Sequence, residues 1–352
     1  MSINTPVKTN PWLYWFAVLT AAATFLLLGL GGLVTSHEAG MSVPDWPTSY
    51  GYNMFALPIK MWAGGAFFEH THRLLASAVG LMTTILAVWL WLKDSRPWMR
   101  WLGVVAFLLV VAQGVLGGLR VTMHMDALGI FHGTIAQLFF VLTCALALFT
   151  SRFWAELAAN QTMLRVPSGL RTLVLSTTLL IFGQLMLGAT MRHQHAGLAI
   201  PDFPLAYGRW WPDTSADAVA GYNAHRVEVN GENPITPFQI VLQMAHRGAA
   251  LAIFILVAGC FWQARRRLGG KDSLTKLALV WLALILAQVA LGAATIWYNK
   301  AADVATMHVL VGALALTVGA LWCIMAFRRS DPAIETQPEG VFGAQPAMAA
   351  NK

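Results

Sequence analysis

The sequence predicts an all-α integral membrane protein whose eight transmembrane helices form two tandem four-helix bundles, arranged as parallel repeats. The chain has 352 residues and is 57% hydrophobic and 11% charged, whereas soluble domains are about 25% charged. Eight apolar stretches are long enough to cross a bilayer, which takes about 20 residues each. Motifs of the first half also recur in the second half. This composition excludes a soluble enzyme, a disordered protein and a nucleic-acid-binding module, and it makes membrane lipid the expected environment.

The eight stretches are continuously apolar and do not alternate with polar residues as barrel strands do, so we expect α-helices. They lie at residues 12–34, 66–92, 101–119, 128–150, 170–191, 237–262, 277–297 and 305–327. The first ten residues contain one lysine and no arginine, and the apolar run after them is too long for a signal-peptide core. We therefore expect the first stretch to be retained as a helix.

The placement of basic residues predicts the orientation. If the N-terminus is cytoplasmic, 15 of the 23 lysines and arginines lie on the cytoplasmic side and 8 on the outer side or at outer helix ends. Arg265, Arg266 and Arg267 follow a helix directly, where the positive-inside bias is strongest. The sequence thus predicts a multi-pass protein of the bacterial inner (plasma) membrane with both termini in the cytoplasm.

The chain contains an internal repeat. HEAGMSVPDWPTSYG at residues 37–51 is followed 157 residues later by QHAGLAIPDFPLAYG, and Q-x-x-L-G occurs at residues 113–117 and 288–292. Each half has four spans, so both halves have the same orientation and are related by an axis along the membrane normal. The predicted parts are a cytoplasmic N-terminus (1–11), an N-terminal bundle (12–150), a cytoplasmic linker (151–169), a C-terminal bundle (170–327) and a disordered cytoplasmic tail (328–352).

The repeated loop contains Pro-Asp-aromatic-Pro. This pattern predicts a rigid turn, because two prolines fix φ and an aspartate side chain can accept hydrogen bonds from nearby backbone. We expect the loop to fold over the helix ends as a lid, with direct contact to a substrate as the alternative.

Four histidines lie in the outer parts of the even-numbered spans: His72, His132, His246 and His308. Ionisable residues inside a membrane are costly and usually functional. His72 and His132 can face each other across the first bundle, and His246 and His308 across the second. Two imidazoles approaching from opposite sides form an axial ligand pair for a haem iron. The alternative is that these histidines are hydrogen-bonded residues of the core. A zinc site is less suitable, because two histidines in each half do not supply the third and fourth ligands that zinc needs.

Two arginines follow these histidines directly, Arg73 and Arg247. A cation at the outer edge of each pocket suits the carboxylates of haem propionates. The alternative is that both side chains extend to the lipid headgroups.

One position differs between the halves. Glu69 lies three residues before His72 and shares its helix face, whereas the repeat has Gln243. A carboxylate near a metal can accept a proton or stabilise a positive charge, and an amide can do neither. We therefore expect chemistry in the N-terminal half and electron storage or relay in the other. The alternative is a surface glutamate at the entrance of the helix.

The E-x-x-H-R motif of residues 69–73, the second H-R at His246 and Arg247, and the histidines of the fourth and eighth spans together resemble the haem A synthase family over residues 12–327. The resemblance implies oxidation of a ring methyl of haem O to a formyl group by successive hydroxylations. It also makes a haem O synthase (a farnesyltransferase) and cytochrome oxidase assembly factors plausible partners, and it admits a homo-oligomer.

The resemblance also implies residue roles. The N-terminal half takes the substrate haem at His72 and His132. The C-terminal half holds a haem B at His246 and His308, with Arg247 beside it. Glu69 corresponds to the catalytic acid of the family.

The chain departs from some members of the family in one respect. It has no cysteine between residues 35 and 69, so it resembles a subgroup that lacks the cysteine pair of the outer loop.

The alternative function is a diheme b-type membrane cytochrome that relays electrons to or from quinone. A relay does not need an acid in one half only. A transporter or haem exporter is a further alternative, but it predicts spans interrupted by proline, and no predicted span has a proline in its middle.

Overall fold

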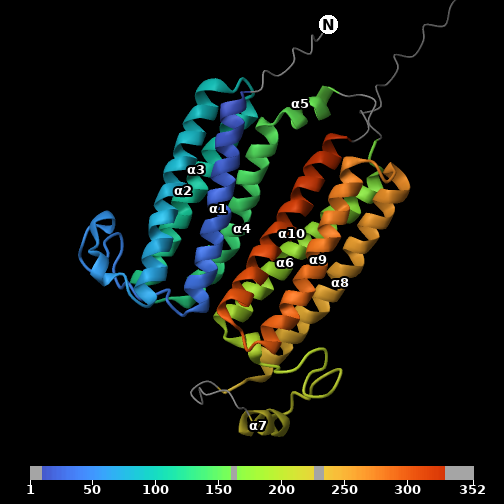
Figure 1. Cartoon of the computed structure of the whole chain (residues 1–352). Helices are drawn as coiled ribbons and strands as arrows, with labels where there is room; N and C mark the ends of the chain where they lie inside the picture. Colours follow the sequence, from blue (N-terminus) through green and yellow to red (C-terminus); the bar gives the residue numbers. More distant parts are fainter. Residues whose placement is uncertain (1–9, 160–164, 226–233, 330–352) are drawn as a thin grey trace, which may run out of the picture.

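The computed structural model describes residues 10–159, 165–225 and 234–329 of the chain, and Figure 1 presents its architecture. Within these ranges the chain is helical, with two isolated bridges in the loops and no longer strand. Most of the predicted tail 328–352 and of the predicted N-terminal segment 1–11 lies outside the described residues. The expected disorder of the tail therefore stays a prediction.

Eight of the described helices are long and apolar enough to span a membrane, which confirms the predicted all-α membrane class with eight spans. They are α1 (Pro11–Ser36), α2 (Gly65–Lys93), α3 (Pro97–Thr122), α4 (Asp126–Thr150), α6 (Ser168–His193), α8 (Pro237–Leu268), α9 (Ser273–Trp297) and α10 (Ala302–Arg328). Each helix is a few residues longer than its predicted apolar range, because polar residues next to the apolar run also adopt the helical backbone conformation. The largest extension is in α8, which continues through three arginines to Gly269, where φ is 85°.

Sequence signals at the helix starts agree with the structure. Prolines occupy the first turn of α1, α3 and α8, where a missing N–H costs nothing and the fixed φ is already helical. Asn10 caps α1 by accepting hydrogen bonds from the amides of Trp12 and Leu13. Thr236 and Gln239 form a reciprocal capping box at the start of α8.

Two shorter helices lie outside the spans. The first, α5 (Arg152–Ala159), lies within the predicted linker 151–169, and the second, α7 (Ala216–Ala224), belongs to the longer outer loop of the second half. Short 3-10 turns, η1 (Met54–Ala56), η2 (Ile59–Met61) and η3 (Ala196–Leu198), occur in the two loops.

The long helices form two groups, which Figure 1 shows side by side. In the first, α1 contacts α2 and α4, and α3 contacts α2 and α4. In the second, α6 contacts α8 and α10, and α9 contacts α8 and α10. Contacts of α1 with α10, and of α4 with α6 and α10, join the groups along a seam. The symmetry axis that relates the two halves stays a prediction.

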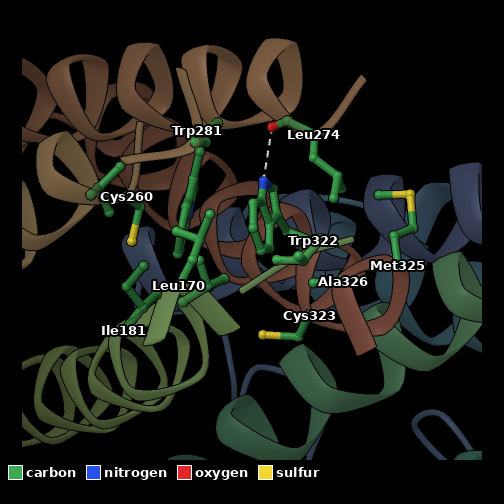
Figure 2. Close-up of a cluster of buried hydrophobic side chains, with 14 of the residues drawn as sticks. Leu170, Ile181, Cys260, Leu274, Trp281, Trp322, Cys323, Met325 and Ala326 are labelled. Atoms are coloured by element: carbon green, nitrogen blue, oxygen red, sulfur yellow. Dashed lines mark hydrogen bonds between the residues drawn. The ribbon is translucent and has the colours of Figure 1, made fainter. Parts of the chain in front are cut away.

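Two buried tryptophans organise the core of the second group, which Figure 2 shows. The indole N–H of Trp281 donates to the Ala315 carbonyl at 2.8 Å, and that of Trp322 to the Leu274 carbonyl at 2.8 Å. Both indoles are therefore fully buried with their polar atoms satisfied, which low-dielectric surroundings require. A Cβ atom on Gly319 would lie 2.7 Å from Trp281 Cζ2, so glycine is needed for this close approach of α9 and α10.

The packing around Gly319 gives a stability prediction. Gly319→Ala should lower the thermal midpoint in detergent, because overpacking a tight core costs about 1–3 kcal/mol. Gly259→Ala is the matched control, since its Cβ meets no atom within 4 Å. The control should be neutral or slightly stabilising, as alanine favours helix over glycine by about 1 kcal/mol. Equal midpoints for the two variants would contradict the predicted close packing.

Candidate functional site

Each of the four predicted histidines packs against a glycine of the preceding long helix. The glycines are Gly31 in α1, Gly117 in α3, Gly188 in α6 and Gly292 in α9. Cβ atoms built on them would lie 3.2, 3.3, 3.4 and 3.3 Å from the Cε1 atoms of His72, His132, His246 and His308, respectively. A side chain at any of these glycines would therefore crowd an imidazole ring.

These glycines were missed as site residues at the sequence level, although two signals were present. Gly117 and Gly292 are the last residues of the repeated Q-x-x-L-G motif, and Gly31 and Gly188 are separated by 157 residues, the same offset as the loops. The signals have no meaning until the neighbouring helix is known, because a glycine in an apolar helix can face lipid equally well.

The structure brings the histidines of each half together. The ring centroids of His246 and His308 are 6.4 Å apart, with 53° between the ring planes. The rings of His72 and His132 interact electrostatically. Metal–nitrogen bonds of about 2.0 Å on both sides, added to the radii of two imidazoles, require about 6 Å between centroids. The spacing in the second half therefore suits one metal atom between the rings.

The surroundings of the four rings bear on both interpretations, metal ligands and hydrogen-bonded core histidines, and metal ligation stays a prediction. In all four, Nδ1 is buried and has no hydrogen-bond partner of ordinary geometry in the described part of the chain. Of these four rings, only that of His308 has a ring nitrogen within hydrogen-bond distance of a described side chain: its Nε2 lies 3.4 Å from Gln288 Nε2. Main-chain groups of Leu27, Gln113 and Gln288 also act on the rings of His72, His132 and His308, respectively.

Each of the three residues with these main-chain groups lies one helical turn before the glycine that the ring contacts. A metal-bound histidine usually donates its second N–H to a main-chain carbonyl or a carboxylate. Among the described side chains, no group of three or more His, Cys, Asp or Glu residues is arranged to hold a metal ion. A donor set of two imidazoles in each half suits a group that brings most of its own ligands, as a porphyrin does.

Glu69 is buried, with 4% of its surface exposed, so the alternative of a surface glutamate is wrong. Its Oε2 accepts a hydrogen bond from the Val43 amide at 2.9 Å, and its Oε1 accepts one from Arg73 at 2.7 Å. Gln243 is equally buried, and its Oε1 accepts from the Ile200 amide at 2.7 Å. The two side chains thus anchor equivalent points of the two loops, and only Glu69 adds a charge.

The arginines after the histidines hold the loops. Arg73 is 9% exposed and donates to the carbonyls of Val43, Asp45 and Thr48 at 2.7–3.0 Å. This burial excludes the alternative that Arg73 extends to the lipid headgroups. The predicted contact of Arg73 with a propionate is not tested by these bonds and stays a prediction.

Arg247 makes the equivalent contacts in the second half. It donates to the carbonyls of Asp202 and Leu205 at 2.7 and 2.9 Å. Its guanidinium also lies 5.4 Å from the Phe203 ring centroid. Its Nε is buried without a hydrogen-bond partner among the described residues, so one donor is left for a further acceptor.

The predicted turn around Asp45 is present. Its carboxylate accepts hydrogen bonds from Thr48 Oγ1 and from the amides of Tyr50 and Gly51 at 2.5–2.8 Å. Burial opposes ionisation, but these hydrogen bonds outweigh it and hold the pKa of Asp45 below its ordinary value. The Tyr50 hydroxyl donates to the Ser42 carbonyl at 2.5 Å. These bonds fold the loop back on itself at the outer end of α2, as the lid interpretation expects.

The second loop repeats the backbone bonds of this pattern, with Leu205 in place of Thr48. Asp202 accepts from the amides of Tyr207 and Gly208 at 2.7 and 2.8 Å, and the Tyr207 hydroxyl donates to the Ala199 carbonyl. Both loops have a cis proline in the repeated motif, Pro47 and Pro204.

A further histidine belongs to the first loop. His70 is fully buried; its Nδ1 lies 3.4 Å from Ser49 Oγ and its ring meets Trp62 edge-on at 4.7 Å. Nothing in the sequence indicated this contact, because it joins α2 to a loop residue 21 positions earlier.

The turn gives a prediction on pH and loop order. Asp45→Asn should speed amide hydrogen exchange across residues 43–51, because an amide replaces one acceptor oxygen with a donor. The folded pKa of Asp45 is depressed, so its stabilisation is present above the ordinary carboxyl pKa of about 3.9 and is lost as pH falls through the folded value. The equivalent Asp202→Asn should act on residues 200–208 only. Unchanged exchange in both variants would contradict the role of these carboxylates.

The chain is similar to known proteins along most of its length. Residues 14–319 match the family COX15-CtaA, described as cytochrome oxidase assembly protein. The chain is also similar to the protein named Heme A synthase in Halalkalibacterium halodurans, with 27% identity over 307 residues that cover 86% of this chain and 93% of the relative.

Two further relatives carry the same name. In Symbiobacterium thermophilum the identity is 31% over 286 residues, covering 79% of this chain and 84% of the relative. In Shewanella oneidensis it is 25% over 322 residues, covering 84% and 91%. Because the family match extends over most of the chain and includes both histidine pairs, this protein belongs to the COX15-CtaA family of cytochrome oxidase assembly proteins.

Proposed function

We propose that this protein is a haem A synthase, which oxidises a ring methyl of haem O to a formyl group by successive hydroxylations. The names of its relatives support the coarse function. The observation that carries the proposal is an asymmetry within a repeat. Both halves have an imidazole pair set against glycines, but only the first has a buried carboxylate one helical turn from a histidine.

In this proposal His246 and His308 hold a haem B, and His72 and His132 hold the substrate haem O. The ring spacing of 6.4 Å in the second half supports it, and so does the burial of Nδ1 in all four rings. When bound, haem supplies one-electron iron chemistry that no amino-acid side chain provides. The free Nε of Arg247 supports a contact from this residue to a propionate of the haem B.

Glu69 is the proposed catalytic acid. Its two oxygens are held by the Val43 amide and by Arg73, so the carboxylate cannot rotate away from its position one turn before His72. A carboxylate fixed there can accept a proton from the reacting methyl group or stabilise positive charge on it. Gln243 makes the same bond to the backbone and offers neither function.

The loop over residues 37–51 is proposed to exclude water from this carboxylate. Arg73 ties three of its carbonyls to α2, and Val43, the residue bonded to Glu69, is fully buried. Exclusion of water strengthens every electrostatic interaction inside a site.

The proposed setting is a bacterial inner membrane with both termini in the cytoplasm. A haem O synthase and oxidase assembly factors are the proposed partners, and a homo-oligomer is compatible with the fold.

Glu69→Gln tests the catalytic acid, because Gln243 demonstrates that an amide can keep the bond to the loop. In cells that also express a haem O synthase, the variant should bind haem but yield at least about 100-fold less haem A, the usual size of an acid–base contribution. The measurement is the haem extracted from membranes. Glu38→Gln, which removes an exposed carboxylate of the same loop, is the control.

Two outcomes would decide against parts of this proposal. Full haem A production by Glu69→Gln would remove Glu69 from the mechanism. If the unmodified protein yields only haems B and O, the synthase function is wrong and the diheme cytochrome relay is favoured.

The glycine contacts give a second prediction. Gly292→Val should displace the His308 ring, because the first added carbon already lies 3.3 Å from Cε1. We expect haem retention in the second half to fall about 10-fold, from overpacking of about 1–2 kcal/mol, and the low-spin absorbance of the bound haem to weaken. Gly183→Val on α6, where an added Cβ meets nothing within 4 Å, should leave the spectrum unchanged. Identical spectra in both variants would contradict haem ligation by His308.

A further inference from the structure

An arginine side chain crosses the seam between the two bundles. Arg192 is near the end of α6 and reaches across to α1 of the other bundle. Its Nη2 donates to the Gly32 carbonyl at 2.7 Å and to Ser36 Oγ at 2.5 Å. Ser36 Oγ in turn lies 3.3 Å from Thr306 Oγ1 of α10. One guanidinium thus joins three helices from both bundles.

This contact is close in sequence to one histidine contact of each half. Gly32 follows Gly31, which packs on His72, and Thr306 lies two residues before His308. A Cβ on Gly32 would be 2.8 Å from Thr306 Cγ2, so α1 has no room for a side chain where it packs on Thr306 of α10. The charge of Arg192 acts on the His308 ring.

The charge of Arg192 has no counter-charge among the described residues. A carbonyl and a hydroxyl are its hydrogen-bond partners, and among the described side chains no carboxylate forms an ion pair with it. The charge of Arg120 also acts on Arg192, which makes a nearby anion more favourable. A half-buried guanidinium in a membrane protein is costly without an anionic partner.

The arginines of the H-R motifs offer fewer donors to an anion. The terminal nitrogens of Arg73 and Arg247 donate to loop carbonyls, and the Nε of Arg247 is left for one propionate. A haem B held by His246 and His308 carries two propionate carboxylates. Arg192 has a charge near His308 and guanidinium donors beyond the Nη2 bonds to α1.

We propose that Arg192 binds a propionate of the haem in the C-terminal half and thereby links that haem to α1, the helix against which His72 packs. This inference rests on the proposed function. It makes Arg192 a positioning residue for the haem B and a determinant of its reduction potential. A positive charge near a haem favours the reduced iron, so its removal lowers the potential.

Redox titration of the purified protein tests the proposal. Arg192→Gln should shift the midpoint potential of the C-terminal haem to a more negative value. It should also release haem to an acceptor protein about 10-fold faster, as expected for the loss of one charge-assisted hydrogen bond. Arg192→Lys, which keeps the charge, should restore most of the potential. Arg209→Gln is the control, because it removes the same charge from an exposed position in the outer loop.

Ser36→Ala separates the charge from packing at the seam. It removes a hydrogen bond of Arg192 and leaves the guanidinium, so the potential should stay at the wild-type value. The proposal is overturned if Ser36→Ala shifts the potential as much as Arg192→Gln does, or if Arg192→Gln shifts it no more than Arg209→Gln.

A phosphate of an anionic lipid offers the same chemistry as a propionate. In nanodiscs made only of zwitterionic lipid, the difference between wild type and Arg192→Gln should persist. A difference that appears only with anionic lipid would assign the guanidinium to a headgroup and overturn the proposal. A wild-type protein without low-spin haem would instead refute the proposed function, so the two failures are distinguishable.

Discussion

Close approach of helices at glycine is the constraint on which the candidate site depends. Four imidazoles occupy the interior of apolar helices, where each ring needs space and a defined orientation. Glycines on the preceding helices supply both, with ring contacts of 3.2–3.4 Å from the position of a missing Cβ. Carbonyls one turn earlier act on three of the rings, as a second hydrogen-bond shell of a metal ligand would. The same principle brings α1 against α10 at Gly32.

The two halves share the same hydrogen bonds between helix and loop but differ in the charge at one position. Glu69 and Gln243 accept the same loop amide, Arg73 and Arg247 donate to equivalent carbonyls, and Asp45 and Asp202 close the same turn. An oxygen acceptor at position 69 is therefore required for the loop, whereas a negative charge is not. The charge in the first half needs another explanation, and proton transfer is the explanation that the asymmetry favours.

The seam gives the two halves a common element. Arg192 belongs to the second bundle by sequence, yet its hydrogen bonds are to α1 of the first. Because Gly31 and Gly32 face different neighbours, one segment of α1 supports His72 and contacts Thr306 near the other pair. A displacement of α1 would therefore affect both pairs of histidines.

The sequence by itself determined the eight spans, the duplicated pattern and the identity of the four histidines. These follow from local properties: the length of an apolar run, the cost of an ionisable group in lipid, and recurrence at a constant offset. The turn at Asp45 was also predictable, because its hydrogen bonds join residues within six positions. Only the tertiary structure decided the loop partners of Glu69 and Arg73 and the partners of Arg192. These contacts join residues 25–160 positions apart, and the free energy of a buried charge depends on neighbours that packing alone brings together.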